Sequence, residues 1–128
     1  MSEKICLFCD KDDPTKHRII AENELIYSRW DNFPVTPGHA EIVPKRHVES
    51  FFDLKPEELK QLYNMLFQTK VKIQEIHTVS DFTIGINEGV LAGRTVHHLH
   101  VHIIPRYQGD VPNPRGGIRN IIPGKGDY

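Results

Sequence analysis

The sequence predicts a single α+β domain, with a mainly antiparallel sheet of about five strands, one long helix and a short one. Segments with strand composition lie both before and after one long segment with helical periodicity. The chain has 128 residues, of which 38% are hydrophobic and 26% charged, as is typical of one soluble domain with its own core. Because no internal repeat divides the sequence, we interpret residues 1–128 as one domain that ends in a tail at 108–128.

The first half of the chain contains two predicted strands. Residues 6–13 are polar and turn-like, and residues 24–30 (ELIYSRW) have the mixed aromatic and aliphatic composition of a strand. The two prolines and one glycine of DNFPVTPGH indicate a loop. Residues 39–44 (HAEIVP) then predict a second strand that a proline ends.

The long helix is predicted over residues 55–77. Pro56 suits the first turn, and the acidic Glu57 and Glu58 favour the positive end of the helix dipole. Apolar residues recur at a spacing of three to four and predict the buried stripe, which consists of Leu59, Leu62, Leu66, Ile73 and Ile76.

The second half of the chain predicts two more strands and an irregular end. Residues 81–87 (DFTIGIN) alternate between apolar and polar, and residues 88–95 form a loop that contains two glycines. Residues 96–105 (VHHLHVHIIP) predict the last strand. The remaining tail is rich in proline and glycine, so we expect it to be extended on the surface.

The composition excludes some classes of partner. Sixteen basic side chains and seventeen acidic ones give a formal charge of −1, which favours neither nucleic acid nor a membrane surface as a partner. There is no apolar run of about 18 residues that could span a membrane, and the N-terminus lacks the apolar stretch of a signal peptide. We therefore expect a cytoplasmic protein, in which Cys6 and Cys9 are thiols or metal ligands rather than a disulfide.

Three histidines alternate with apolar residues near the end of the chain. Side chains of a strand alternate between its faces, so His98, His100 and His102 should share one face, roughly 6.6 Å apart along the strand. Such a set can hold zinc with an open coordination position, or it can act in catalysis near neutral pH. His97 has the opposite parity and is expected to be a solvated residue.

The histidines belong to a longer pattern that resembles a known family. GRTVHHLHVHIIPR, PGHAEIVPKRHVESFFDL and CLFC together resemble the motifs of the histidine triad (HIT) family, over residues 6 to about 107. The tail GDVPNPRGGIRNIIPGKGDY is similar to a bacterial branch near the diadenosine polyphosphate hydrolases. The resemblance implies nucleotidyl transfer or hydrolysis at the α-phosphate of a nucleotide. It also implies a homodimer whose sheet continues across the two subunits.

The resemblance assigns a role to each catalytic histidine. His100, the middle residue of the triad, would be the nucleophile that forms a covalent nucleotidyl-histidine. In the family, the ring nitrogen of this histidine that does not attack phosphorus donates a hydrogen bond to a backbone carbonyl. His102 would hold the phosphate and share the proton of the leaving group. His98, the first triad histidine along the chain, completes the catalytic set.

The resemblance also implies a set of nucleotide-binding residues. Asp31 would bind the ribose hydroxyls, and His39 would lie beside the active centre. Asn87 and Thr95 would contact the phosphate, although a strand-end cap and a turn are the alternative interpretation of these two residues. Arg94 stands where many family members have glutamine, and it would either reach toward a longer polyphosphate or be solvated.

Cys6 and Cys9 have the Cys-x-x-Cys spacing of zinc ligands. Zinc-containing members of the family use two cysteines, the histidine of the Pro-Lys-x-His segment and the first triad histidine. The ligands here would then be Cys6, Cys9, His47 and His98, a closed and hence structural set. The alternative is a pair of thiols without metal. No organic cofactor is expected.

The sequence thus favours a nucleotide hydrolase or transferase that acts through His100. Two alternatives stay open, a zinc-dependent enzyme with its metal at the triad and a nucleotide-binding partner protein with incidental catalysis. The two remaining histidines belong to no motif. His77 is expected to end the helix, where a cation suits the dipole, and His17 is expected to lie on the surface.

Overall fold

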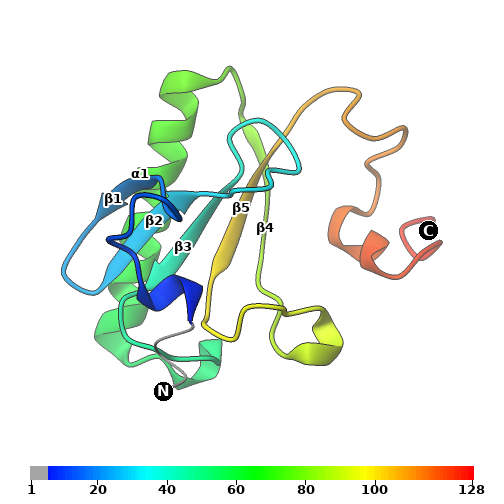
Figure 1. Cartoon of the computed structure of the whole chain (residues 1–128). Coiled ribbons are helices and arrows are strands. Elements are labelled where there is room, and N and C mark those ends of the chain that lie inside the picture. The colour runs from blue at the N-terminus through cyan, green and yellow to red at the C-terminus, as the bar shows by residue number, and fades with distance from the viewer. Residues whose placement is uncertain (1–5) are drawn as a thin grey trace.

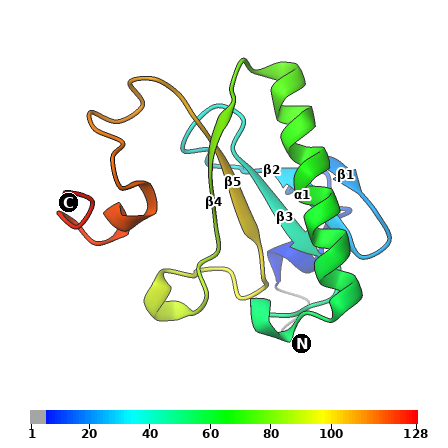
Figure 2. The ribbon, with the colours of Figure 1, turned by 180° about the vertical axis from the view of Figure 1, so that it is seen from behind.

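The structure is a computed structural model that describes residues 6–128. Its regular elements are β1 (Ile19–Glu22), β2 (Ile26–Trp30), β3 (Ala40–Pro44), α1 (Pro56–Ile76), β4 (Asp81–Gly85) and β5 (Val101–Arg106). The strands form one sheet in the order β1-β2-β3-β5-β4, and every neighbouring pair is antiparallel. α1 covers one face of this sheet, and residues 6–9, which we call the N-terminal segment, lie on the other (Figures 1 and 2). The predicted α+β class is confirmed.

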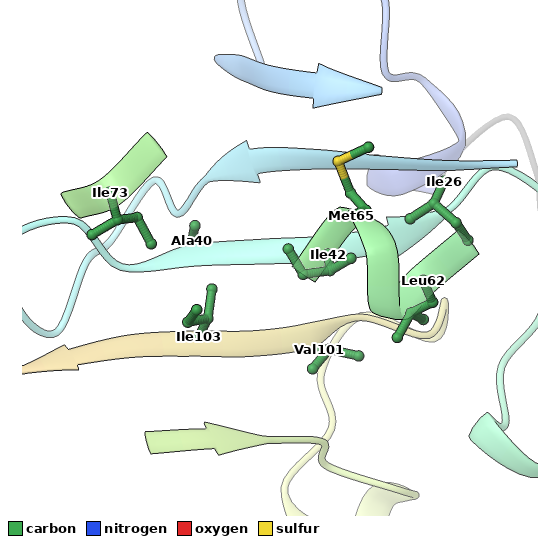
Figure 3. Close-up of a cluster of buried hydrophobic side chains, with 8 residues drawn as sticks. All are labelled: Ile26, Ala40, Ile42, Leu62, Met65, Ile73, Val101 and Ile103. Atoms are coloured by element: carbon green, nitrogen blue, oxygen red, sulfur yellow. The ribbon is translucent and has the colours of Figure 1, made fainter. Parts of the chain in front are cut away.

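The main core lies between α1 and the sheet. Figure 3 shows its buried cluster, which consists of Ile26, Ala40, Ile42, Leu62, Met65, Ile73, Val101 and Ile103. The buried positions of α1 are Glu58, Leu62, Met65, Thr69 and Ile73. The predicted stripe was therefore partly wrong, because Leu59 and Ile76 are 46% and 58% exposed. Counting apolar letters alone missed Thr69, whose hydroxyl donates to the Met65 carbonyl inside the helix and so can be buried.

A second apolar stripe runs along the outside of α1. Leu59, Tyr63, Phe67 and Val71, each four residues from the next, are 39% to 62% exposed. We call these four residues the outer stripe. Since residues four apart lie on the same side of a helix, the outer stripe is a continuous apolar surface that the described part of the chain leaves uncovered.

An ion pair fixes the start of α1 to the loop that follows β3. The Glu58 carboxylate accepts the Lys55 backbone N–H at 2.8 Å and two hydrogen bonds from the Arg46 guanidinium, at 2.8 and 2.9 Å. The hydrogen bonds from Arg46 lower the pKa of Glu58 to about 2. The loop that contains His47 is thereby held at the N-terminal end of the helix.

Several predicted segments differ from the structure. β1 was not predicted, since its four residues are too short to show a period. The last strand was predicted over 96–105 but begins at Val101. Its partner β3 ends at Pro44, which has no N–H to donate, and the Leu99 N–H instead donates to the Val48 carbonyl at 2.7 Å. The short helix of the prediction corresponds to 3-10 turns, for example Val90–Ala92.

The tail lies on the β4 side of the sheet, away from β1 (Figures 1 and 2). Most of its residues are exposed, but it is not extended throughout as predicted, because Gly117–Ile121 form a 3-10 helix. Gly116, in the left-handed region with φ 85°, allows the chain to turn into this helix. Across residues 6–128, none of the helices has the length and apolar character needed to cross a membrane.

Candidate active site and metal site

The three alternating histidines have different surroundings. His98 is fully buried, and its Nε2 donates to the Pro44 carbonyl at 2.8 Å. This bond leaves Nδ1 as the ring nitrogen with the lone pair, and Nδ1 lies 3.4 Å from the Cys6 Sγ and 3.5 Å from the Cys9 Sγ. Burial lowers the pKa of His98 to about 4, so the ring is neutral at pH 7, the state that binds metals.

The four residues predicted to bind zinc meet at this point. Cys6, Cys9, His47 and His98 each offer one ligand atom, and these atoms all lie within 4.8 Å of one another. The Cys9 Sγ is 3.1 Å from the His47 Nδ1. Ordinary Zn–S and Zn–N bonds at a tetrahedral angle place a sulfur and a nitrogen about 3.6 Å apart, so the cluster has the chemistry and nearly the size of a closed zinc site. It joins the N-terminal 3-10 turn, the loop after β3 and the segment before β5.

His100 is oriented by the backbone. Its Nδ1 lies 2.8 Å from the His98 carbonyl oxygen, to which it must donate. The lone pair is then on Nε2, which has no hydrogen bond within residues 6–128. The Phe8 ring packs edge-on against the imidazole, with centroids 4.8 Å apart. Burial lowers the pKa of His100, which favours the neutral nucleophilic form.

His102 is oriented by His39. The Val35 N–H donates to the His39 Nδ1 at 3.2 Å, so neutral His39 carries its proton on Nε2. That nitrogen lies 2.9 Å from the His102 Nδ1 and 3.4 Å from the Asp31 Oδ2. His102 Nδ1 is therefore an acceptor, and the remaining proton of His102 is on Nε2. Burial lowers the pKa of His102, which keeps it in this neutral form near pH 7.

A cavity of about 360 Å³ opens beside these two rings. Asp31, Asn87, Thr95, His100 and His102 all line it, so the structure brings together five residues that the sequence assigned to the site. The Phe33 N–H donates to the Asp31 Oδ1 at 2.7 Å and fixes that carboxylate at the cavity wall. Two loops, the segment just before β5 and β5 itself thus present a carboxylate, an amide, a hydroxyl and two imidazoles to one bound molecule.

Arg94 does not join this group. Its guanidinium donates to the Glu49 backbone carbonyl at 3.2 Å, to the Glu49 carboxylate at 3.3 Å and to the His97 Nδ1 at 3.1 Å. The predicted contact between Arg94 and a polyphosphate is therefore not supported by its placement. His97 is exposed, as its parity predicts.

Sequence reasoning missed a buried polar group behind the cavity. His17, expected on the surface, is 5% exposed. Its Nδ1 accepts from the Arg29 Nε at 2.9 Å, and its Nε2 donates to the Leu7 carbonyl at 2.9 Å. Arg29 in turn pairs with Glu41, its direct cross-strand neighbour. The signal in the sequence was a pair of opposite charges, Arg29 and Glu41, each within a predicted strand.

The comparisons with known proteins identify the family. The HIT domain matches residues 13–109. An uncharacterized HIT-like protein of Methanocaldococcus jannaschii is 34% identical over 121 residues, which cover 91% of this chain and 92% of that protein. The bis(5′-nucleosyl)-tetraphosphatase (asymmetrical) of Schizosaccharomyces pombe is 43% identical over 77 residues, 60% of this chain and 42% of that protein. The AP-4-A phosphorylase of Mycobacterium tuberculosis is 33% identical and covers 72% of this chain and 48% of that protein. The chain thus spans less than half of the length of the tetraphosphatase and of the AP-4-A phosphorylase.

Two solved structures share the fold. A HIT family protein from Bacillus anthracis aligns with a TM-score of 0.76 at 31% identity, over 83% of this chain and 76% of that chain. A Zn-bound histidine triad family protein from Mycobacterium smegmatis aligns with a TM-score of 0.72 at 31% identity, over 84% and 79%. The matches come from bacteria, archaea and a eukaryote, so they do not single out a bacterial branch. With its fold, its histidines and three quarters of its length matched, the chain belongs to the HIT domain family.

Proposed function

We propose that this protein is a nucleotide hydrolase or transferase that acts at the α-phosphate of a dinucleoside polyphosphate or a nucleoside phosphoramidate. The orientation of His100 carries this proposal. With Nδ1 donating to the His98 carbonyl, the Nε2 lone pair stands beside a cavity that also presents Asp31, Asn87 and Thr95. The names of two relatives, a bis(5′-nucleosyl)-tetraphosphatase and an AP-4-A phosphorylase, refer to the first of these classes, the dinucleoside polyphosphates.

The reaction would proceed in two steps. In the first, His100 Nε2 attacks the α-phosphorus, the bond to the leaving group breaks, and His102 gives its Nε2 proton to the leaving atom. In the second, water or phosphate attacks the nucleotidyl-histidine, the P–N bond breaks, and the proton of the attacking group returns to His102. Asn87 and Thr95 would donate to the phosphate oxygens while charge builds up on them.

Asp31 would hold the ribose. A carboxylate can accept both hydroxyls of a cis-diol, and the backbone of Phe33 fixes one Asp31 oxygen. The assignment to a bacterial branch near the diadenosine polyphosphate hydrolases and the cytoplasmic location stay predictions from the sequence.

Zinc would act structurally in this protein. We propose that Cys6, Cys9, His47 and His98 bind it, as the ligand distances and the Zn-bound relative support. When bound, zinc would tie the N-terminal segment to His98, in the chain that leads into β5 and two residues before the proposed nucleophile His100.

The protein would function as a homodimer. The outer stripe of α1 supports this proposal, because four exposed apolar side chains in line need a cover. The edge strand β4 has one free side as well, where a second sheet can add. A monomer in light scattering at micromolar concentration would refute it.

Trapping the adduct tests the mechanism. After brief incubation with a dinucleoside polyphosphate labelled at the α-phosphate, the wild-type protein should carry label that acid releases and base does not, as phosphohistidine chemistry requires. His100→Asn should carry no label and lose turnover, while His97→Asn, a neighbouring histidine outside the site, should behave as wild type. If His100→Asn still formed the adduct and kept its activity, the proposed nucleotidyl-histidine mechanism through His100 would be wrong.

The same preparation separates the two alternatives. Asp31, His39 and His102, and also Glu41, His100 and His102, could each hold an ion. A metal-dependent reaction at the triad would stop at once when a chelator is added, whereas the proposed chemistry would continue until the N-terminal segment loosens. A partner protein with incidental catalysis would bind nucleotides tightly and turn over none of a panel of polyphosphates, phosphoramidates and esters.

A further inference from the structure

Glu41 is a buried carboxylic acid next to the active centre that the proposed mechanism does not use. It lies in β3 opposite His102 of β5 and is 4% exposed. Its Oε2 is 4.0 Å from the His102 Nδ1, and its Oε1 pairs with the Arg29 guanidinium. It also lines the cavity that contains Asp31 and the two catalytic histidines.

Four titratable or charged groups surround Glu41 on the neighbouring elements. Arg29 of β2 is its counter-ion, and the charge of Asp31, just after β2, raises its pKa. His102 of β5 and His39, at the start of β3, are neutral rings. Burial, together with the charge of Asp31, raises the pKa of Glu41 to about 7 against the opposing effect of Arg29. Near neutral pH Glu41 is therefore partly protonated, whereas Asp31, whose pKa is lowered, is ionised.

His102 needs such a proton. A neutral imidazole that gives up its Nε2 proton becomes an anion unless Nδ1 receives a proton in the same step. The atom that faces His102 Nδ1 is the His39 Nε2, 2.9 Å away, and the Asp31 Oδ2 lies 3.4 Å behind it. The Asp31 Oδ2 and the Glu41 Oε2 each lie 4.0 Å from the His102 Nδ1, so the two carboxyl groups and His39 together surround the nitrogen that must receive the proton.

We propose that Glu41 is a positioning residue that stores the proton for His102 and acts through Asp31 and His39, so that the site suits leaving groups that must depart protonated, above all amines. The inference rests on the proposed function of His100 and His102. It predicts that turnover depends on Glu41 more strongly for nucleoside phosphoramidates than for polyphosphates, because a polyphosphate leaves as a stable anion and an amine does not.

The proton count closes over one turnover. When the P–N bond of the substrate breaks, its electron pair stays on the amine nitrogen, which takes the proton of His102 Nε2. His39 Nε2 passes its proton to His102 Nδ1. In the same movement Glu41 passes its proton to Asp31, and Asp31 passes a proton to His39 Nε2. The Glu41 carboxylate that remains is paired with Arg29. When water opens the nucleotidyl-histidine, its proton returns along the same line to Glu41.

Two substrates with different leaving groups test this proposal. Glu41→Gln keeps the shape of the side chain but cannot store a proton. It should lower kcat for adenosine 5′-phosphoramidate at least about tenfold, while the p-nitrophenyl ester of AMP, whose leaving group needs no proton, should keep its kcat within about twofold. Glu24→Gln, an exposed carboxyl lost far from the cavity, is the matched control and should leave both rates unchanged.

The outcome is decisive even if single variants are damaged. Equal loss on both substrates, or no loss on either, overturns the proposal. Should Glu41→Gln misfold, Arg29→Met with Glu41→Leu removes both buried charges at similar volume, and the same split between substrates is expected. The carboxyl ¹³C resonance of Glu41 gives a reading without activity, since it should titrate near pH 7. Titration near 4.5 would overturn the relay while leaving the proposed function intact.

Discussion

If Cys6, Cys9, His47 and His98 bind zinc as proposed, removal of the zinc should loosen the N-terminal segment without unfolding the domain. No residue of this segment belongs to the cluster between α1 and the sheet. Two contacts give the contribution of the N-terminal segment to the free energy of unfolding. Phe8 is 2% exposed, and burying such a ring contributes about 2–3 kcal/mol. The hydrogen bond from the Tyr27 hydroxyl to the Phe8 carbonyl, 2.7 Å long, adds about 1 kcal/mol.

The sum, about 3–4 kcal/mol, corresponds to a fall in Tm of roughly 10–15 °C for a domain of this size. Calorimetry with and without a chelator would measure it, together with the metal content by atomic absorption. Cys9→Ser should give the same lower Tm and no longer respond to the chelator, while His97→Gln, next to a ligand but outside the cluster, should keep metal and Tm. Wild-type protein free of zinc, with a Tm that Cys9→Ser does not change, would refute the structural site.

Three further outcomes are expected. Because Arg46 lowers its pKa to about 2, ionised Glu58 stabilises the fold above pH 4.5, and this contribution should be lost as the pH falls toward 2. Arg46→Met should lower the unfolding free energy at pH 7 by roughly 1–3 kcal/mol. In urea titrations it should also reduce the loss of stability between pH 4.5 and 2, and an unchanged loss would contradict the prediction. Phe67→Lys, at the middle of the outer stripe, should convert the proposed dimer into monomers in light scattering, and a dimer that persists would move the interface elsewhere. Asp31→Ala should weaken the binding of AMP about tenfold in calorimetry and weaken the binding of 2′,3′-dideoxy-AMP much less. An equal loss for both nucleotides would exclude Asp31 from the ribose site.

The strong periodic signals predicted the fold well. α1 differs from its predicted range by one residue at each end, and β3 also begins one residue later than predicted. The buried stripe of α1 was less accurate, because Thr69 is polar in the sequence and satisfies its hydroxyl within the helix. Sequence letters do not show which polar groups find a partner.

The site was predicted through motifs rather than through environment. The motifs placed Asp31, Asn87 and Thr95, which do line one cavity with the histidines. They gave no warning that Arg94 is held by Glu49, a contact across 45 positions of the chain. Nor could they show that His17 is buried, since its burial depends on Arg29 in a neighbouring strand. Long-range pairing of side chains decides both cases.

The early end of the β5 ladder has a consequence for redesign. In a fully paired strand, the carbonyl of residue 98 would be a ladder acceptor for the N–H of a neighbouring strand. Here it is outside the strand and accepts the His100 ring instead. A variant in which residues 98–100 joined the ladder would give this carbonyl a strand N–H to accept, and it would release the ring of the proposed nucleophile from its tether. Greater stability at this end of the sheet and a correctly aimed imidazole are therefore competing design goals.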